Sequence, residues 1–206
     1  SPEGLNRLLS PEDRQDYYRN RFYIHQYQLN TGLSQQLTFG QHTASINDIS
    51  LDGHYMLFST SKETLTEQPF SKNTMFLLDL QTMKLDTLWK DEKFANSAEF
   101  SPDGKQILIS GAPEAFNGIG LNIKSGQIAN SYDTQAFIMN LESRNIDPIT
   151  KYFNPAINSQ WWNIKDNCIY LKVDDKDCEN IYKYTPTTRK YEKLPLKEEL
   201  IRSLDR

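Results

Sequence analysis

Apolar residues alternate with polar residues in short runs along the chain, and the best-defined runs are separated by turn-forming residues. The clearest example is residues 97–110, where an alternating run lies on each side of Pro102-Asp103-Gly104. A period of two indicates a strand with one buried face, and an Asp-Gly pair supplies the positive φ angles of a tight hairpin turn. Residues 46–59 repeat the pattern, with Asp52 placed 51 positions before Asp103. The sequence therefore predicts repeated antiparallel hairpins.

A second hairpin motif follows each of these, and it recurs four times. The copies lie at residues 27–38, 76–84, 137–145 and 181–189. Equivalent positions in successive copies are 51, 61 and 43 residues apart. One four-stranded propeller blade takes about 40 to 45 residues. We therefore interpret the longer intervals as insertions between the second and third strands of a blade, at residues 60–72 and 111–133.

These repeats predict an all-β fold, a partial β-propeller of about three and a half four-stranded blades built from WD40-like or TolB-like Asp-Gly hairpins. The predicted segments are a lead-in at 1–21, a half blade at 22–40, blades at 42–90, 94–151 and 156–195, and a tail at 196–206. In the last blade Lys165-Asp166-Asn167 replaces the Asp-Gly turn, and Asn can adopt the left-handed conformation. An incomplete ring is expected to leave one apolar blade face open and to self-associate.

The ends of the chain have helical signals. Ser10 is a capping residue followed by proline at the first helical position, which predicts a short helix from Pro11 to about Asn20. A second amphipathic stretch runs from Leu196 to Leu204.

Composition narrows the partners. The chain is 37% hydrophobic with a net charge of -4 and scattered basic residues, which fits a globular domain and argues against a nucleic-acid partner. No apolar run approaches the roughly 18 residues of a membrane span, and the first residues lack the order of a secretory signal. The hairpin register places Cys168 opposite a residue near Thr185 and far from Cys178, which predicts free thiols. The three histidines do not cluster with the cysteines, so we expect no metal and no cofactor.

A family resemblance rests on three sets of residues. The motif at 100–109, with the downstream Asp/Asn-Leu-x-Thr/Ser strand end, resembles blades of TolB-like proteins and of prolyl oligopeptidase-family peptidases. Residues 111–122, together with 3–9 and 13–21, resemble bacterial dipeptidyl peptidase IV-like enzymes of that family. The resemblance implies a periplasmic or secreted serine exopeptidase in which a propeller gates access for peptide substrates and docks an α/β-hydrolase domain. The sequence contains no Gly-x-Ser-x-Gly, so we expect no catalytic residue in this chain.

Several residues are candidates for contacts with ligands. Family members hold the substrate amino terminus with paired glutamates, but the adjacent pair here, Glu198-Glu199, lies in a polar tail and is interpreted as a solvated face. Glu114 and Phe116, beside glycines in the long insertion, are the substrate-binding candidates, with a purely structural role as the alternative.

Other conspicuous residues have structural explanations. Asp52 and Asp103 are explained by their turns. Trp161 and Trp162 cannot share one face of a strand, so one is expected in the core and the other at solvent or a neighbouring domain, with a paired binding platform as the alternative.

Two other functions stay open. A TolB-like scaffold would bind a protein partner without enzymatic activity. A sugar-processing propeller would need acidic residues that converge on a central channel.

Overall fold

The computed structural model describes residues 20–64, 66–124, 126–196 and 201. The chain divides into two compact units, residues 1–45 and residues 46–206. The predicted helix at 11–20 lies outside the described residues except for Asn20, and the pair Glu198-Glu199 lies outside them entirely. Among the described residues, no helix has the length and apolar character needed to cross a membrane.

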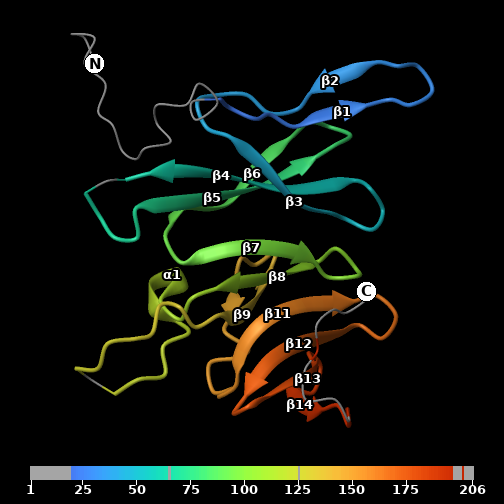
Figure 1. Cartoon of the computed structure of the whole chain (residues 1–206). Coiled ribbons are helices and arrows are strands. Elements are labelled where there is room, and N and C mark those ends of the chain that lie inside the picture. Colours follow the sequence, from blue (N-terminus) through green and yellow to red (C-terminus); the bar gives the residue numbers. More distant parts are fainter. Residues whose placement is uncertain (1–19, 65, 125, 197–200, 202–206) are drawn as a thin grey trace. The chain divides into compact units, whose positions relative to one another are not determined.

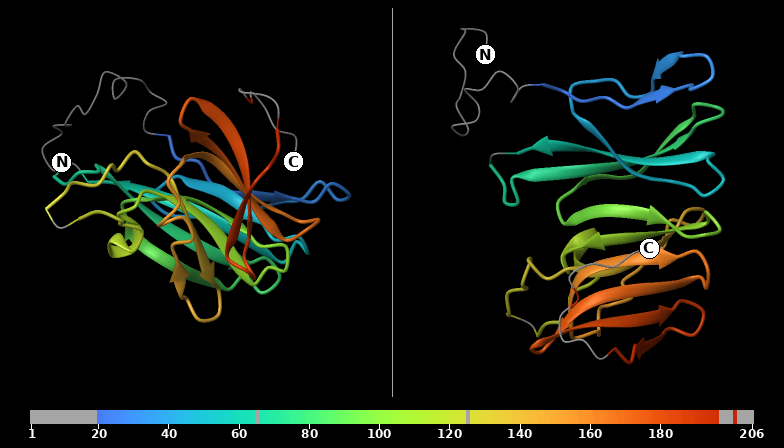
Figure 2. Two further views of the ribbon diagram at one scale, coloured as in Figure 1. Left: turned by 90° about the horizontal axis from the view of Figure 1, so that it is seen from below. Right: turned by 45° about the vertical axis from the view of Figure 1, so that its right-hand side comes forward.

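The described residues form antiparallel sheets, which confirms the all-β prediction (Figures 1 and 2). The first unit contains a hairpin of β1 (His25–Tyr27) and β2 (Ser34–Gln36). The first four-stranded sheet consists of β3 (Ala44–Ile49), β4 (Tyr55–Glu63), β5 (Ser71–Asp79) and β6 (Leu85–Glu92). The second sheet consists of β7 (Ala95–Phe100), β8 (Gln106–Gly111), β9 (Gln135–Asn140) and β10 (Ile146–Asp147). The third sheet consists of β11 (Ala156–Asn163), β12 (Cys168–Asp175), β13 (Cys178–Thr185) and β14 (Lys190–Lys193).

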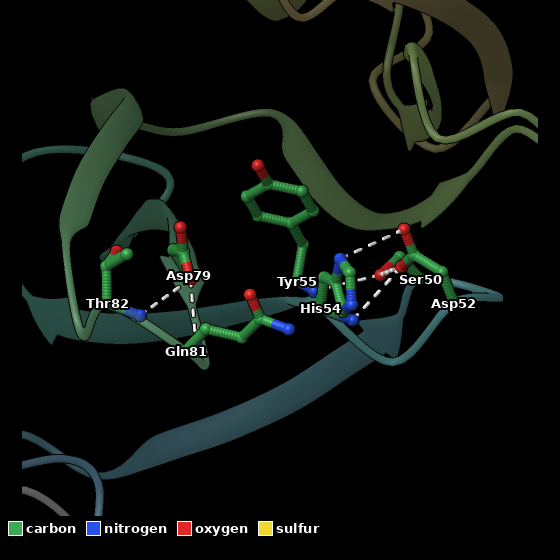
Figure 3. A network of polar contacts seen from close by, with 7 residues as sticks. All are labelled: Ser50, Asp52, His54, Tyr55, Asp79, Gln81 and Thr82. Carbon is green, nitrogen blue, oxygen red and sulfur yellow. Dashed lines mark hydrogen bonds and ion pairs between the residues drawn. The ribbon is translucent and has the colours of Figure 1, made fainter.

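In each four-stranded sheet, the turn between the first and second strands is formed by the residues that the sequence indicated. Gly53 and Gly104 have φ angles of 71° and 67°, and Asn167 has the left-handed φ of 54° in the third sheet. Asp52 Oδ1 accepts hydrogen bonds from Ser50 Oγ at 2.6 Å and from the His54 amide at 3.0 Å (Figure 3). These bonds lower the pKa of Asp52. The aspartate is thus an element of the turn, as predicted.

The turns between third and fourth strands share a second geometry. Met83, Arg144 and Arg189 occupy equivalent positions and have φ angles of 58°, 62° and 55°. Gly32, with φ of 72°, holds the same position in the β1–β2 hairpin. In the first sheet, Asp79 Oδ1 accepts hydrogen bonds from two following amides of this turn (Figure 3). The fold therefore requires a residue with a left-handed φ at this turn position. Among these four described turns, only the β1–β2 hairpin has a glycine there.

The three four-stranded sheets pack their apolar side chains against one another in chain order. One cluster joins Leu57 and Met75 of the first sheet to Ile107, Ile109, Phe137 and Met139 of the second. Another joins Leu108, Ala136 and Ile138 of the second sheet to Ile169, Leu171 and Val173 of the third. Alternate residues of β8 thus face opposite neighbours, which is how a strand buried on both faces packs.

The insertion expected at 60–72 is shorter, because β4 continues to Glu63 and β5 starts at Ser71, which leaves 64–70 as the connection. The extra strand residues, such as Ser61 opposite Asn73, are polar and gave no apolar alternation.

The prediction of free thiols is confirmed, since both cysteines are free and Cys168 Sγ lies 3.8 Å from Thr185 Oγ1.

Candidate functional site

The two ends of the sheets in the second unit differ in loop length. One end carries the turns between first and second strands and between third and fourth strands, which are all short. The other end, at the left in Figure 1, carries the connection 64–70 and the insertion 112–134 with the single-turn helix α1 (Ala115–Gly118). Binding residues concentrate on long loops held by a rigid scaffold. We therefore take the long-loop end as the candidate site.

A hollow of about 630 Å³ lies at this end. It is bordered by the 64–70 connection, the start of β7 and the insertion. Phe70 is 53% exposed and Tyr132 is 98% exposed, so two aromatic rings stand open beside the hollow. Its lining residues are Gln68, Pro69, Phe70, Ser71, Lys93, Phe94, Asn96, Ala112, Ser131 and Tyr132.

Glu114, a candidate from the sequence, contacts a residue of this hollow. Its Oε1 accepts a hydrogen bond from Ser131 Oγ at 2.6 Å. Its Oε2 is buried and has no hydrogen-bond partner among the described residues. A buried carboxylate oxygen without a donor is unfavourable, so a cationic donor that reached it would gain a charge-assisted hydrogen bond.

Phe116, the other candidate, is partly buried and packs against the core cluster between the first and second sheets. Its ring packs edge-to-face against Trp89 at 5.5 Å and against Phe137 at 5.7 Å between ring centroids. Its amide donates a hydrogen bond to Glu92 Oε2 at 3.2 Å, and its φ is 53°. The side chain thus anchors the insertion to the first and second sheets. Contact with substrate by Glu114 or Phe116 stays a prediction.

Charged side chains hold the neighbouring loops in place. Glu67, in the 64–70 connection, forms ion pairs with Lys72 at 3.0 Å and Lys93 at 2.8 Å. Hydrogen bonds from Lys93 and Lys72 lower the pKa of Glu67 to about 2. Glu92 Oε1 accepts hydrogen bonds from the amides of Lys93 and Phe94. The loops around the hollow are therefore tied together by carboxylates.

Close packing also fixes the first part of the insertion, at Gly111 and at Gly120. A Cβ at Gly111 would lie 2.7 Å from the Phe94 carbonyl oxygen, and a Cβ at Gly120 would lie 2.4 Å from Gln135 Oε1. Lys151 Nζ donates a hydrogen bond to the Ile119 carbonyl at 3.1 Å. Gly111 and Gly120 thus serve close approaches within the fold.

A second hollow, of about 620 Å³, lies at the short-turn end, where the first strands of all three sheets end. Trp162 is 7% exposed, whereas Trp161 stacks on Tyr170 with ring centroids 5.5 Å apart and borders the hollow. This confirms that the two tryptophans face opposite sides of the strand. Leu51 and Ile164 at its rim are 68% and 61% exposed. The sequence did not reveal this hollow, because its lining comes from three separate blades.

Comparison with known proteins supports the fold and leaves the family open. No family model matches the chain. TolB from Acinetobacter baumannii is 13% identical with a TM-score of 0.57, over 86% of this chain and 38% of that chain. An oligogalacturonate lyase in complex with manganese is 10% identical with a TM-score of 0.63, over 84% of this chain and 47% of that one. Pyrococcus horikoshii acylaminoacyl peptidase is 17% identical with a TM-score of 0.51, over 84% of this chain and 27% of that one.

These similarities show that the sheets are propeller blades. The chain spans less than half of the length of each of these three proteins. The described residues hold no group of three or more His, Cys, Asp or Glu side chains placed to bind a metal ion.

Proposed function

We propose that this chain is a non-catalytic propeller segment of a serine exopeptidase that resembles dipeptidyl peptidase IV-like enzymes. In this proposal the catalytic α/β-hydrolase domain lies outside the chain, and the propeller gates substrate access and docks that domain. The resemblance of residues 111–122 and the fold shared with a peptidase support the proposal. The observation that carries it is the Glu114 carboxylate, because one oxygen is oriented by Ser131 and the other has no donor among the described residues.

The proposed role of Glu114 is to bind the amino terminus of the peptide substrate. An ammonium group needs a compensating charge when it leaves water, and a carboxylate with a free oxygen provides one. The Ser131 hydroxyl fixes the carboxylate from the other side. Recognition of the substrate terminus at a fixed distance from the hydrolase nucleophile would give cleavage of short units from the amino end.

The hollow at the long-loop end is the proposed docking surface for the hydrolase domain. Its exposed rings, Phe70 and Tyr132, suit the aromatic anchors that dominate protein interfaces. The ion pairs of Glu67 keep the surrounding loops in one arrangement before docking.

The test compares chromogenic dipeptides, including those with proline at the second position, that have a free or an acetylated amino terminus. In the longer parent protein, Glu114→Gln should lower kcat/KM for the free amine by about 10- to 100-fold, the value of a hydrogen bond to a charged group. The acetylated substrates should be unaffected. Glu142→Gln, at an exposed turn of the same sheet, is the matched control. An equal loss for both substrates would contradict the proposal, and the isolated chain should show no hydrolysis.

A TolB-like scaffold that binds a protein partner is the second candidate. The likeness to TolB and the exposed apolar rim of the short-turn hollow, with Leu51 and Ile164, favour it. A parent protein without hydrolytic activity toward the whole panel would favour this scaffold.

A further inference from the structure

Each four-stranded sheet has a row of four side chains, one from each strand, and in the first two sheets this row lies on the face toward the following sheet. In the second sheet the strand register aligns Glu99, Leu108, Ile138 and Asp147. In the first sheet it aligns Leu57, Leu77 and Asp86, and Asp48 stands at the β3 position equivalent to Glu99. Both rows thus read acid, aliphatic, aliphatic, acid from the first strand to the fourth.

The acid on the first strand of each of these two rows, called the inner acid, binds the first strand of the following sheet. Asp48 Oδ2 accepts a hydrogen bond from the Phe100 amide at 2.7 Å. Glu99 Oε1 accepts one from the Trp162 amide at 2.5 Å, and Trp162 is the position equivalent to Phe100. Carboxylates that accept from backbone amides form charge-assisted bonds. The same link therefore joins the first sheet to the second and the second to the third.

The acid on the fourth strand of each of these two rows, called the outer acid, binds an arginine of the following sheet. Asp86 pairs with Arg144, and Asp147 pairs with Arg189. Both arginines occupy the left-handed position of the turn between third and fourth strands. The partner that a row accepts is thus defined by two features, an amide of a first strand and an arginine in this turn.

The third sheet keeps only the outer acid. Its register aligns Trp161, Tyr170, Lys183 and Glu192. Lys183 Nζ lies 2.9 Å from Asp166 Oδ2, and the Tyr170 hydroxyl donates to the same oxygen at 2.8 Å. An aromatic pair and a lysine therefore replace the inner acid and the two aliphatic side chains. The row of the third sheet is therefore mixed, with two aromatic side chains and two charged ones, and self-association through an open blade face stays a prediction.

Glu192 is exposed, and its carboxylate has no ion-pair or hydrogen-bond partner among the described residues. Beside its row, the chain after β14 already contacts the same face. The Ile201 amide donates to Glu179 Oε2 at 2.6 Å, and Lys172 Nζ donates to the Ile201 carbonyl. Glu192, at the fourth-strand end of the row, stays exposed beside these contacts.

We propose that the row of Trp161, Tyr170, Lys183 and Glu192 docks a further blade, whose turn between third and fourth strands presents an arginine to Glu192. The Trp161–Tyr170 stack takes the inner strand of that blade in place of an acid-to-amide bond. This inference rests on the proposed function only in requiring a longer protein. A second copy of the chain is a poorer partner, because its first sheet has Met83 where Arg144 and Arg189 stand in the other two.

The test is carbodiimide-mediated labelling of carboxylates, read by mass spectrometry, on the longer protein and on the 206-residue chain. Glu192 should be labelled in the chain and protected several-fold in the longer protein. Glu142, exposed in the turn of the second sheet, should be labelled equally in both. In the longer protein, Glu192→Arg should lower the melting temperature, and reversing the charge of the arginine in the further blade should restore it.

Equal labelling of Glu192 in both proteins would overturn the inference. Protection in the isolated chain together with a dimer mass by light scattering would also overturn it, because a second copy would then occupy the row. The labelling is independent of hydrolysis. A parent protein without peptidase activity but with protected Glu192 would therefore contradict the proposed function and leave this inference standing.

Discussion

Replacement of Phe116 by alanine tests whether this side chain is structural. The ring is half-buried, and it touches Trp89 of the first sheet and Phe137 of the second. It belongs to the insertion, and Trp89 and Phe137 belong to two different sheets. Removal should therefore loosen the base of the insertion and the contact between two sheets together.

The magnitude follows from burial and ring contacts. A fully buried Phe→Ala change costs about 3 to 5 kcal/mol, and each edge-to-face pair contributes about 0.5 to 1.5 kcal/mol beyond burial. Because Phe116 is only half-buried, we expect the free energy of unfolding to fall by about 2 to 3 kcal/mol. For a chain of this size the melting temperature should fall by about 4 to 12 °C.

Urea denaturation monitored by tryptophan fluorescence measures this change, with Tyr132→Ala as the control. Tyr132 lies in the same insertion and is 98% exposed, so its removal should change stability by less than about 0.5 kcal/mol. A loss below about 1 kcal/mol for Phe116→Ala would refute the structural role. A raised KM in the parent protein without loss of stability would instead support contact between this ring and substrate.

Two further predictions concern single residues. Met83→Gly should stabilise the chain by about 0.5 to 1 kcal/mol in thermal or urea unfolding, because the strain at φ of 58° exceeds the entropy cost of glycine; Met83→Ala, which keeps the strain, should not stabilise. Glu67 has a folded pKa of about 2, below its ordinary value of 4.5, so its ion pairs with Lys72 and Lys93 add stability above about pH 4.5 that is lost as the pH falls toward 2. Glu67→Gln should flatten this part of the stability–pH curve, and an unchanged curve would contradict the ion pairs.

The hairpins could be predicted from the sequence because their signals are local. An Asp-Gly pair defines a turn within four residues, and Asn167 could replace it since asparagine tolerates the left-handed conformation. The free state of Cys168 followed from register alone, because the turn near 176 places Thr185 opposite it. These predictions needed no knowledge of how one blade meets another.

The candidate site was harder to predict because its contacts are distant in sequence. Glu114 was selected for its place in the insertion, but its contact with Ser131 depends on how residues 112–134 fold back. Phe116 was a substrate-binding candidate with a structural role as the alternative, and only the arrangement of two sheets shows its contacts with Trp89 and Phe137. The sequence of a loop does not show which of its side chains pack against the core.

The rows between sheets explain how one repeated fold can carry different partners. Asp48 and Glu99 sit at equivalent sites and make the same bond, so the first two junctions are interchangeable in their chemistry. Trp161 at the third equivalent site cannot accept an amide hydrogen bond, and this changes what can follow the third sheet. Specificity at a junction thus depends on one inner residue and one outer charge, while the aliphatic positions supply adhesion. An array built this way can make the junction after the third sheet different from the first two without altering the hairpins themselves.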